Sequence, residues 1–305
     1  MTANIDQYQG CLLGLALGDA LGAPYEGGIL ERALWAIVGR SKGRLPRWTD
    51  DTQMSLDLAH SLLHCGGLDQ DDLARRFADS YRWSRGYGPS AARVLKRIRG
   101  GENWAVASKK IYKSGSFGNG AAMRASVLAL FFVGSRAELL EAARKSAEIT
   151  HAHPLGIAGA VLIAVAARCL LARQSTAQIF AELSATCEAP QLCKRLEIAA
   201  DWLDKQAQPS AKEVARTLGN GITAETSCVT ALYIALRFLS ADFKAMLAFT
   251  IACGGDVDTI AAMAGTLWGA FNGGAALPSV EIEQRAEIGQ IAVRLHEYAV
   301  SAGGA

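Results

Sequence analysis

Two short acidic segments carry the residue types best suited to binding hard metal ions. Thr49-Asp50-Asp51-Thr52 and Asp256-Val257-Asp258-Thr259 each combine two carboxylates with hydroxyl groups. Mg²⁺ takes six oxygen ligands and binds carboxylates and hydroxyls readily, whereas Zn²⁺ favours histidine and cysteine. Four aspartates could serve two ions, and such a pair can bind a substrate oxygen and activate a water. The residues therefore suggest a dinuclear oxygen-ligand site, provided that the fold brings the two segments together.

Helix capping explains the same acids without a metal, and from the residues alone both interpretations stay open. Each segment comes just before a helical pattern, where acidic side chains suit the helix N-terminus. Asp50 with Gln53 three positions later fits a capping box, and Asp256 or Asp258 could cap the second helix. Capping needs one acceptor at each helix start, however, so it leaves the second acid of each segment unexplained.

The elements that must position these acids are predicted to be helices. Apolar side chains recur at helical spacing, and alternating β-branched runs that end in a hairpin turn are missing. The clearest examples are segments that start near Asp51, Leu73, Phe243 and Ile282, and the alanine-rich stretches 121–130, 157–172 and 260–270. We expect an all-α fold of ten or more helices, a single-domain orthogonal multi-helix bundle with a central dinuclear metal cleft.

The bulk composition predicts one globular domain without a polyanionic partner. The chain has 305 residues, of which 50% are hydrophobic and 20% charged, enough apolar content for a large core. Prolines are few and no linker or repeat divides the chain, so we expect a single domain over residues 1–305. The net charge of +2 predicts no binding to nucleic acid or membrane, and the basic residues between Arg93 and Arg99 have the spacing of a solvated helix face. We expect a monomer.

The N-terminus and the cysteines predict a cytoplasmic protein. The first residues lack the basic region of a secretory signal, and Asp19 interrupts the apolar stretch that follows. The longest apolar run, 156–167, is shorter than the roughly 20 residues that span a bilayer, so a buried core helix is expected there. Seven cysteines without a Cys-x-x-Cys pair are expected to be reduced and buried, with no disulfide and no zinc site.

Five motifs, in their order along the chain, resemble the ADP-ribosylglycohydrolase family nearly from end to end. They are Gly14-Leu-Ala-Leu-Gly18-Asp19-Ala-Leu-Gly22-Ala-Pro-Tyr-Glu26, Trp48-Thr-Asp-Asp-Thr52, Gly115-Ser-Phe-Gly-Asn-Gly-Ala-Ala-Met-Arg124, Thr150-His151-Ala-His153 and Gly254-Gly-Asp-Val-Asp-Thr259. One such motif is modest evidence, whereas five in the family's order are specific. Asp19, in the first motif, is expected to support the site by packing and not as a metal ligand.

The resemblance implies an all-α enzyme with two Mg²⁺ ions, or Mn²⁺, in a central cleft. Such enzymes cleave the C1″ glycosidic bond of the distal ribose of ADP-ribose. The metal ligands implied by position are Thr49, Asp50, Asp51, Asp256, Asp258 and Thr259. The catalytic residues implied are Glu26, Asp50, Asp51 and Asp256. Glu26 matches a glutamate that has been assigned, in some relatives, to gating or to acid–base work.

A glycine-rich loop and a histidine match the ligand-binding parts of the family. Glycines let the backbone approach a ligand closely, and backbone N–H groups can point at a diphosphate. The ligand-binding residues implied are Gly115, Ser116, Phe117, Gly118, Asn119, Gly120 and His151. The loop and the Thr-His-Ala stretch are most similar to the branch that acts on O-linked ADP-ribose, on serine or on poly(ADP-ribose). Phe117 stands where those relatives often carry tyrosine, so ring stacking stays possible and one hydrogen bond is lost.

The expected substrate is an ADP-ribosylated protein, and the expected product is ADP-ribose. The resemblance implies that the ribose 2″ and 3″ hydroxyls bind at the metal pair while a water attacks C1″ through an oxocarbenium-like state. Glu26 or an aspartate would move the proton. A threonine-linked substrate and an arginine-linked one, as in the branch that acts on nitrogenase reductase, stay open. Two other classes also stay open: a catalytically inactive ADP-ribose-binding or structural relative, and a dinuclear phosphohydrolase that releases AMP.

Overall fold

The computed structural model describes residues 3–41 and 43–303, and the prediction of an all-α fold is confirmed. In that part of the chain, β-type pairing is limited to two isolated bridges. Two 3₁₀ helices occur, η1 (Ala23–Tyr25) and η2 (Trp83–Arg85). The α-helices are α1 (Ile5–Gly22), α2 (Ile29–Val38), α3 (Asp50–Cys65), α4 (Gln70–Ser80), α5 (Pro89–Arg99), α6 (Trp104–Ile111), α7 (Ser126–Phe131), α8 (Arg136–Glu148), α9 (Pro154–Leu171), α10 (Thr176–Thr186), α11 (Pro190–Asp204), α12 (Ala211–Thr217), α13 (Ala224–Arg237), α14 (Phe243–Cys253), α15 (Val257–Asn272) and α16 (Arg285–Gly303).

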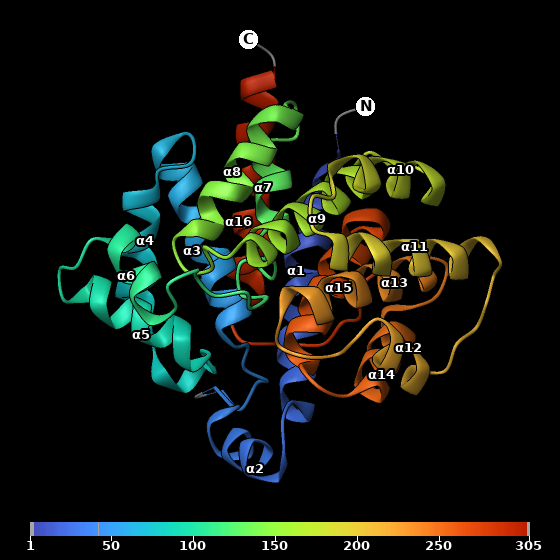
Figure 1. Cartoon of the computed structure of the whole chain (residues 1–305), viewed down its shortest axis with the longest axis horizontal. Coiled ribbons are helices and arrows are strands. Elements are labelled where there is room, and N and C mark those ends of the chain that lie inside the picture. The colour runs from blue at the N-terminus through green and yellow to red at the C-terminus, as the bar shows by residue number, and fades with distance from the viewer. Residues whose placement is uncertain (1–2, 42, 304–305) are drawn as a thin grey trace.

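Helices α1 and α15 pack against each other at the centre of the fold (Figure 1). Their contact is built from glycines spaced four residues apart, which places them on one face of each helix. A Cβ atom on Gly14 would lie 2.3 Å from the carbonyl oxygen of Gly265, and one on Gly10 would lie 2.2 Å from that of Gly269. The backbones of the two helices are therefore in direct contact. Gly10 faces Gly269 and Gly14 faces Gly265, so the two helices run antiparallel. The end of α1 consequently lies beside the start of α15.

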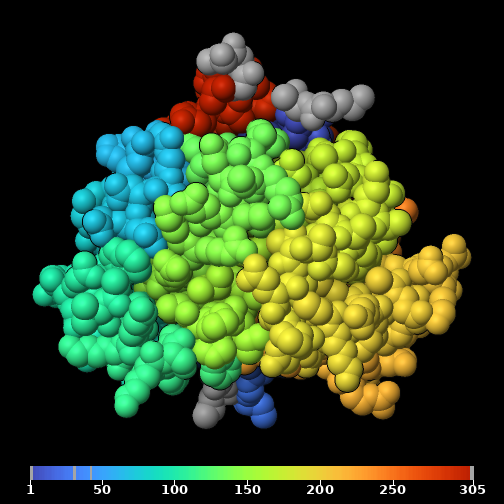
Figure 2. Space-filling model, turned by 45° about the horizontal axis from the view of Figure 1, so that its top comes forward, coloured from blue at the N-terminus to red at the C-terminus, as the bar shows by residue number. Residues whose placement is uncertain are grey.

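The other helices surround this central pair. Helices α3 to α6 lie on one flank and α10 to α14 on the other, with α7, α8 and α9 between them (Figure 1). Figure 2 shows the same order on one face of the molecule, where the green residues of α8 and α9 separate the teal flank from the yellow one. Buried apolar side chains from helices of both flanks and from the central pair form one continuous cluster. The site described below lies at one end of α1.

Helix α3 shows how the sequence sets an element that carries part of the site. Thr49 precedes the helix in an extended conformation, and its hydroxyl oxygen accepts the Asp51 N–H as an N-cap. Met54 and Leu62, which lie on the face predicted from helical spacing, are buried in the core. Gly66 ends the helix in the left-handed conformation, with φ of 68°, where glycine pays no steric penalty.

Several expected helix boundaries differ from the structure. In the alanine-rich stretch 121–130 the helix begins only at Ser126, and the preceding residues form turns. The Arg124 side chain donates to the carbonyl oxygen of Gly120 at 2.5 Å within those turns, an interaction that helical periodicity does not register. Tyr81 caps the C-terminal end of α4, and Ile282 is buried in the segment before α16, so both pack on the core from outside a helix.

The expectation that all cysteines are reduced and buried is wrong for three of them. Cys187 and Cys193 form a disulfide between the end of α10 and the first turn of α11, with Cα atoms 5.9 Å apart. Pro190 starts α11 immediately after a short turn, and this turn brings the two thiols together although they have no Cys-x-x-Cys spacing. Cys65 is exposed at the end of α3. The remaining four, as expected, are free and buried: Cys11, Cys169, Cys228 and Cys253.

Helix α9 contains the longest apolar run. It is 18 residues long, and by length and composition it is the one helix among the described residues that could cross a membrane. However, 72% of this window is buried inside the structure, which is the pattern of a core helix. The predicted core helix is therefore confirmed, although it extends further in both directions than the apolar run that predicted it.

Replacing Gly14 by alanine is expected to destabilise the protein by about 1–3 kcal/mol or more, because the added methyl group meets backbone that cannot give way. Urea unfolding would measure the change. Gly289 in α16 has no atom within 4 Å of an added Cβ, so Gly289→Ala is the matched control and should be neutral or stabilising. Equal effects of the two substitutions would contradict the close packing of α1 on α15.

Candidate metal centre

The two acidic segments meet at the N-terminal ends of α3 and α15. The Asp51 Oδ2 atom accepts a hydrogen bond from Thr49 Oγ1 at 2.8 Å and lies 3.5 Å from Thr259 Oγ1, which comes from the other segment. These side chains are all buried. The fold thus brings the two acidic segments together, which the sequence alone could not establish. Two helix N-termini, each with a positive partial charge, point at the same place.

Glu26 joins the aspartates from the turn that follows η1. A carboxylate oxygen of Glu26, one of Asp256 and one of Asp258 all lie within 4.8 Å of one another, a spacing that would allow them to share a metal ion. Asp256 and Asp258 are 5% and 4% exposed, whereas Glu26 is only partly buried. Glu26 therefore stands where the buried acidic centre opens towards solvent.

Capping does not account for these acids. The N-cap of α3 is Thr49, and Gln53, the predicted partner of Asp50 in a capping box, instead donates its amide to Asp57 at 3.3 Å. Asp256 occupies the N-cap position of α15 but accepts no capping hydrogen bond. The capping interpretation of Asp50 and Asp256 is therefore wrong, because neither carboxylate caps the helix that it precedes or begins.

Burial and mutual repulsion define the electrostatics of this centre. Burial raises the pKa of Asp50, Asp51 and Asp258 well above the usual range, and the neighbouring carboxylates raise it further. Burial also raises the pKa of Asp256, against hydrogen bonds led by that from Asn119. Among the described residues, no ion pair neutralises any of these four aspartates. Buried charges of one sign need a counter-ion or a proton.

A hard divalent cation fits the residues that are present. The Asp51 Oδ1 atom is buried and has no hydrogen-bond partner, so an acceptor is left without the donor that buried polar atoms normally find. The surrounding donors are carboxylate and hydroxyl oxygens, without histidine or cysteine among the clustered ligand atoms. This donor set suits Mg²⁺ or Mn²⁺ better than Zn²⁺.

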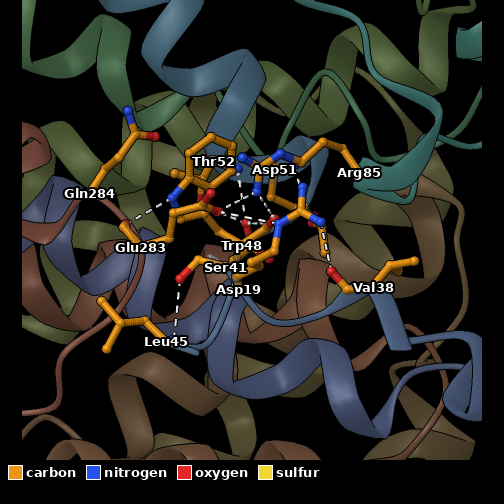
Figure 3. Close-up of polar contacts among 12 residues, drawn as sticks. Asp19, Val38, Ser41, Leu45, Trp48, Asp51, Thr52, Arg85, Glu283 and Gln284 are labelled. Atoms are coloured by element: carbon orange, nitrogen blue, oxygen red, sulfur yellow. Dashed lines mark hydrogen bonds and ion pairs between the residues drawn. The ribbon is translucent and has the colours of Figure 1, made fainter. Parts of the chain in front are cut away.

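Asp19 of α1 holds the start of α3 in place (Figure 3). Its carboxylate accepts the Thr49 N–H at 2.8 and 2.9 Å, the Thr52 N–H at 3.0 Å and the Thr52 hydroxyl at 2.5 Å. Burial raises the pKa of Asp19 to about 6, and these hydrogen bonds oppose the rise. With both oxygens engaged by residues at the start of α3, Asp19 supports the first acidic segment by packing, as the sequence predicted.

A second group of residues fixes Trp48, directly before the first acidic segment (Figure 3). The Arg85 guanidinium lies 3.5 Å over the Trp48 ring centroid and donates to the Trp48 carbonyl oxygen at 2.8 Å. It also pairs with Glu283 at 2.6 Å, and Trp48 Nε1 donates to the Glu283 carbonyl oxygen at 3.0 Å. Sequence reasoning missed Arg85 and Glu283, because neither lies in a motif and their proximity exists only in the fold.

The glycine-rich loop is anchored to the second acidic segment through Asn119. The Asn119 amide donates to Asp256 Oδ2 at 2.5 Å and to Ser227 Oγ at 3.1 Å. Its backbone N–H donates to the Ile222 carbonyl oxygen at 3.1 Å, within the small bridge that joins Gly118 to Thr223. Asn119, predicted as a ligand-binding residue, thus turns its side chain towards the acidic centre. This contact ties the position of the loop to that of the start of α15.

His151 lies beneath the loop. The ring is buried, its Nδ1 atom is 2.8 Å from Thr150 Oγ1, and burial lowers its pKa to about 3, so it is neutral at physiological pH. A Cβ atom on Gly120 would lie 2.6 Å from the His151 Cε1 atom, which explains the glycine there. Arg124, fully buried, donates to the carbonyl oxygens of Gly120 and Ser146. Sequence reasoning gave Arg124 no role, although it ends the loop motif.

The outer side of the loop is apolar and open to solvent. Phe117 is 47% exposed, and its ring meets that of His153 edge to face at 5.6 Å between centroids. Ile222, on the segment bridged to the loop, is 70% exposed. His153 itself caps α9, because its Nδ1 atom accepts the Leu155 N–H. The Phe117 face is therefore free to stack on a planar or ring-shaped ligand.

Comparison with known proteins agrees with this architecture. The family model described as ADP-ribosylglycohydrolase matches residues 1–304. ADP-ribosylhydrolase ARH3 of Homo sapiens is 32% identical, over 88% of this chain and 86% of its own length. The ADP-ribosyl-[dinitrogen reductase] glycohydrolase of Rhodospirillum rubrum is 31% identical, over 90% of this chain and 88% of its own length. A solved structure titled ADP-ribosylglycohydrolase-related protein complex has a TM-score of 0.72 at 28% identity, covering 97% and 98% of the two chains.

Metal-free protein is expected to lose stability as the pH rises from about 4 to about 6. An aspartate whose pKa is raised by folding stabilises the protein fully below its ordinary pKa of about 3.9. That contribution to stability is lost as the pH rises through the pKa of the aspartate in the folded protein, which is about 6 for Asp19. This rise in the Asp19 pKa corresponds to a change in the free energy of unfolding on the order of 3 kcal/mol.

Urea unfolding of EDTA-treated protein across this range would measure the loss. Excess Mg²⁺ should reverse it at neutral pH, because the cation replaces the protons. Asp19→Asn removes the titrating carboxyl group and should flatten the dependence over this range. Metal-free protein that gains stability through the same window would contradict the account.

Arg85→Ala is expected to weaken Mn²⁺ binding by roughly 10- to 100-fold, because residues that orient metal ligands have effects of this size. Isothermal titration calorimetry would measure the dissociation constant. Arg136→Ala removes a comparable Arg–Glu pair between α8 and α10, and should leave Mn²⁺ affinity unchanged. Lower stability of Arg85→Ala with normal Mn²⁺ affinity would mean that the pair serves the fold alone.

Proposed function

The chain belongs to the ADP-ribosylglycohydrolase family, and from that premise we propose that it uses divalent metal ions to release ADP-ribose from a modified protein side chain. The reaction is hydrolysis of the glycosidic bond at C1″ of the distal ribose. The observation that carries the metal requirement is the cluster of aspartates for which the described residues supply no ion pair, with Asp51 Oδ1 left without a hydrogen-bond partner. A structural relative without catalysis would have no need to retain these acids.

We assign two Mg²⁺ ions, with Mn²⁺ as the alternative, to the space between the two helix starts. The residues that would hold them are Thr49, Asp50, Asp51, Asp256, Asp258 and Thr259. Bound there, the ions would orient the ribose hydroxyls and stabilise charge that develops at the anomeric centre. Asp19 and Asn119 would keep the ligands in register, since they bind the first and second segments respectively.

Glu26 is our candidate for moving the proton. Glycoside hydrolysis needs one group to help the leaving oxygen and one to activate water. Glu26 is the member of the cluster that borders solvent, where water enters and the acceptor leaves, and a carboxylate there can exchange protons with bulk water. Asp51 and Asp256 are buried and Asp50 is partly buried, and these three would act mainly by holding charge and orienting the attacking water.

The glycine-rich loop would hold the rest of ADP-ribose. Gly115 has φ of 81°, which turns the backbone at the start of the loop. The N–H groups of Gly115, Gly118 and Asn119 donate within the protein, so the other N–H groups of the loop are the ones that would face the diphosphate. Ser116 is buried and its hydroxyl oxygen accepts the Gly118 N–H at 3.3 Å, which stabilises that turn. His151 would act from beneath, by keeping the loop close to the acidic centre. Phe117 offers its exposed ring for stacking.

We favour an O-linked acceptor, serine or threonine, because residues 115–124 and the Thr150–His151 stretch resemble that branch of the family. Arginine linkage is the alternative, and it is supported by the likeness to the Rhodospirillum rubrum enzyme, whose name specifies dinitrogen reductase as its substrate. We further propose that the chain acts as one domain and a monomer in the cytoplasm, without nucleic acid or membrane as partner.

Asp256→Asn is expected to lower ADP-ribose release by at least about 100-fold, and EDTA should do the same to the wild type, because both remove the charge that positions the metals. The assay is one panel of Ser-, Thr- and Arg-linked ADP-ribosylated peptides, each with and without Mg²⁺, read by chromatography of the products. Full release by both the variant and the EDTA-treated enzyme would refute the mechanism. AMP as the product would identify a phosphohydrolase instead.

A further inference from the structure

Large apolar side chains face solvent on α2 and η2, next to the acidic centre. Ile29, Leu34 and Ile37 of α2 are 87%, 52% and 79% exposed, and Trp83 of η2 is 71% exposed. Helix α2 lies at the edge of the molecule, beyond the end of α1 (Figure 1). A contiguous group of exposed apolar residues can mark a site of interaction with a ligand or a partner protein.

A small pocket connects this apolar group to the acidic centre. It has a volume of about 180 Å³, and its walls include Leu34, Trp35, Val38 and Trp83. Two further residues of the wall, Glu26 and Gly86, belong to the acidic centre or touch it. Glu26 is one of the three clustered carboxylates, and a Cβ atom on Gly86 would lie 3.7 Å from Asp50 Oδ1. An occupant of the pocket would therefore sit directly beside the reacting bond.

The pocket and the glycine-rich loop touch different parts of the acidic centre. Asn119 of the loop binds Asp256, whereas the pocket borders Glu26 and Asp50. In the substrate, the acceptor is attached to C1″ of the distal ribose. When the distal ribose lies at the acidic residues and the diphosphate lies on the loop, the acceptor must extend away from the loop. The side of the centre that is left for the acceptor is the one that the pocket occupies.

The size and chemistry of the pocket select the occupant. Pockets that enclose a whole small-molecule ligand measure roughly 300–1,000 Å³, so this one suits a single side chain. Two indoles and two aliphatic side chains form the apolar part of its wall, and this part gains most from burying an apolar group, whereas Glu26 and Ser84 are the polar residues of the wall. Exposed tryptophans beside such pockets commonly contribute most of the binding energy at interfaces.

We propose that this pocket binds an apolar or aromatic side chain that neighbours the ADP-ribosylated residue in the acceptor protein, and so contributes to substrate specificity. The inference rests on the proposed hydrolysis of protein-linked ADP-ribose. Trp83 and Trp35 pack against the neighbouring side chain of the acceptor, while Glu26 faces the bond to be cleaved. The recognised acceptor is a flexible segment, because its modified residue and its neighbour must enter adjoining pockets together.

The test compares ADP-ribosylated peptides that differ only in the residue next to the modified one, either leucine or aspartate, on each side in turn and in Ser- and Arg-linked series. The wild type should favour leucine by about tenfold in kcat/KM on one side. Trp83→Ala should abolish that preference, while the aspartate peptides and the affinity for free ADP-ribose stay unchanged. Val106→Ala, an exposed apolar residue on α6, is the matched control and should keep the preference.

Each other outcome contradicts a defined part of the account. Release of ADP-ribose without any leucine preference would overturn the pocket assignment alone. An equal loss on all peptides in Trp83→Ala, with weaker ADP-ribose binding, would give Trp83 a structural role instead. No release from any peptide would overturn the proposed function and this inference with it. A dimer by light scattering that Trp83→Ala dissociates would assign the apolar surface to a second copy of the chain.

Discussion

Repulsion among buried carboxylates is the constraint on which the rest of this structure depends. Four aspartates gather at the starts of α3 and α15, and among the described residues no ion pair offsets their charge. Two helix dipoles ease the repulsion but supply only partial positive charge. A fold that maintains such a cluster has to hold it rigidly and to neutralise it with a cation or with protons. The surrounding helices hold the cluster rigidly, and its carboxylate and hydroxyl oxygens are suited to binding a cation.

Helix α1 is what links the two halves of the centre. Its glycine face lets α15 approach until a Cβ on Gly22 would lie 3.0 Å from the Asp258 Cα atom. Asp19, one turn earlier, binds the backbone of Thr49 and Thr52 at the start of α3. One helix thus fixes the position of both acidic segments, and the Arg85–Glu283 pair adds a second restraint on the first of them. The distance between the two acidic segments therefore depends on the packing of α1 as well as on the acidic residues themselves.

The sequence predicted those features that depend on local pattern or on a motif with a fixed order. Helical periodicity identified α3 and α14, and the doubled acids identified Asp50, Asp51, Asp256 and Asp258 as residues that capping did not explain. Asp19 was correctly set apart as a supporting residue. The boundary near Ser126 was predicted wrongly, because residues 121–125 have helix-like apolar spacing but form turns, within which the Arg124 side chain donates to the Gly120 carbonyl oxygen.

What could not be predicted consists of contacts between residues far apart in the chain. Arg85 meets Glu283 only in the folded state, and neither residue type in isolation suggests a role. The hydrogen bond from the Asn119 amide to Asp256 joins two motifs that are far apart in the chain, and the ligand-binding role of Asn119 stays a prediction. The disulfide of Cys187 and Cys193 depends on a turn geometry that spacing alone does not specify.

The most direct test of the central claim is a crystal structure grown with Mn²⁺, with the anomalous signal of the metal mapped. The account predicts two strong peaks between the starts of α3 and α15, bound by oxygens of both acidic segments and with Asp51 Oδ1 among the ligands. Absence of any peak there, or peaks held by residues elsewhere while the aspartates stay protonated, would contradict it.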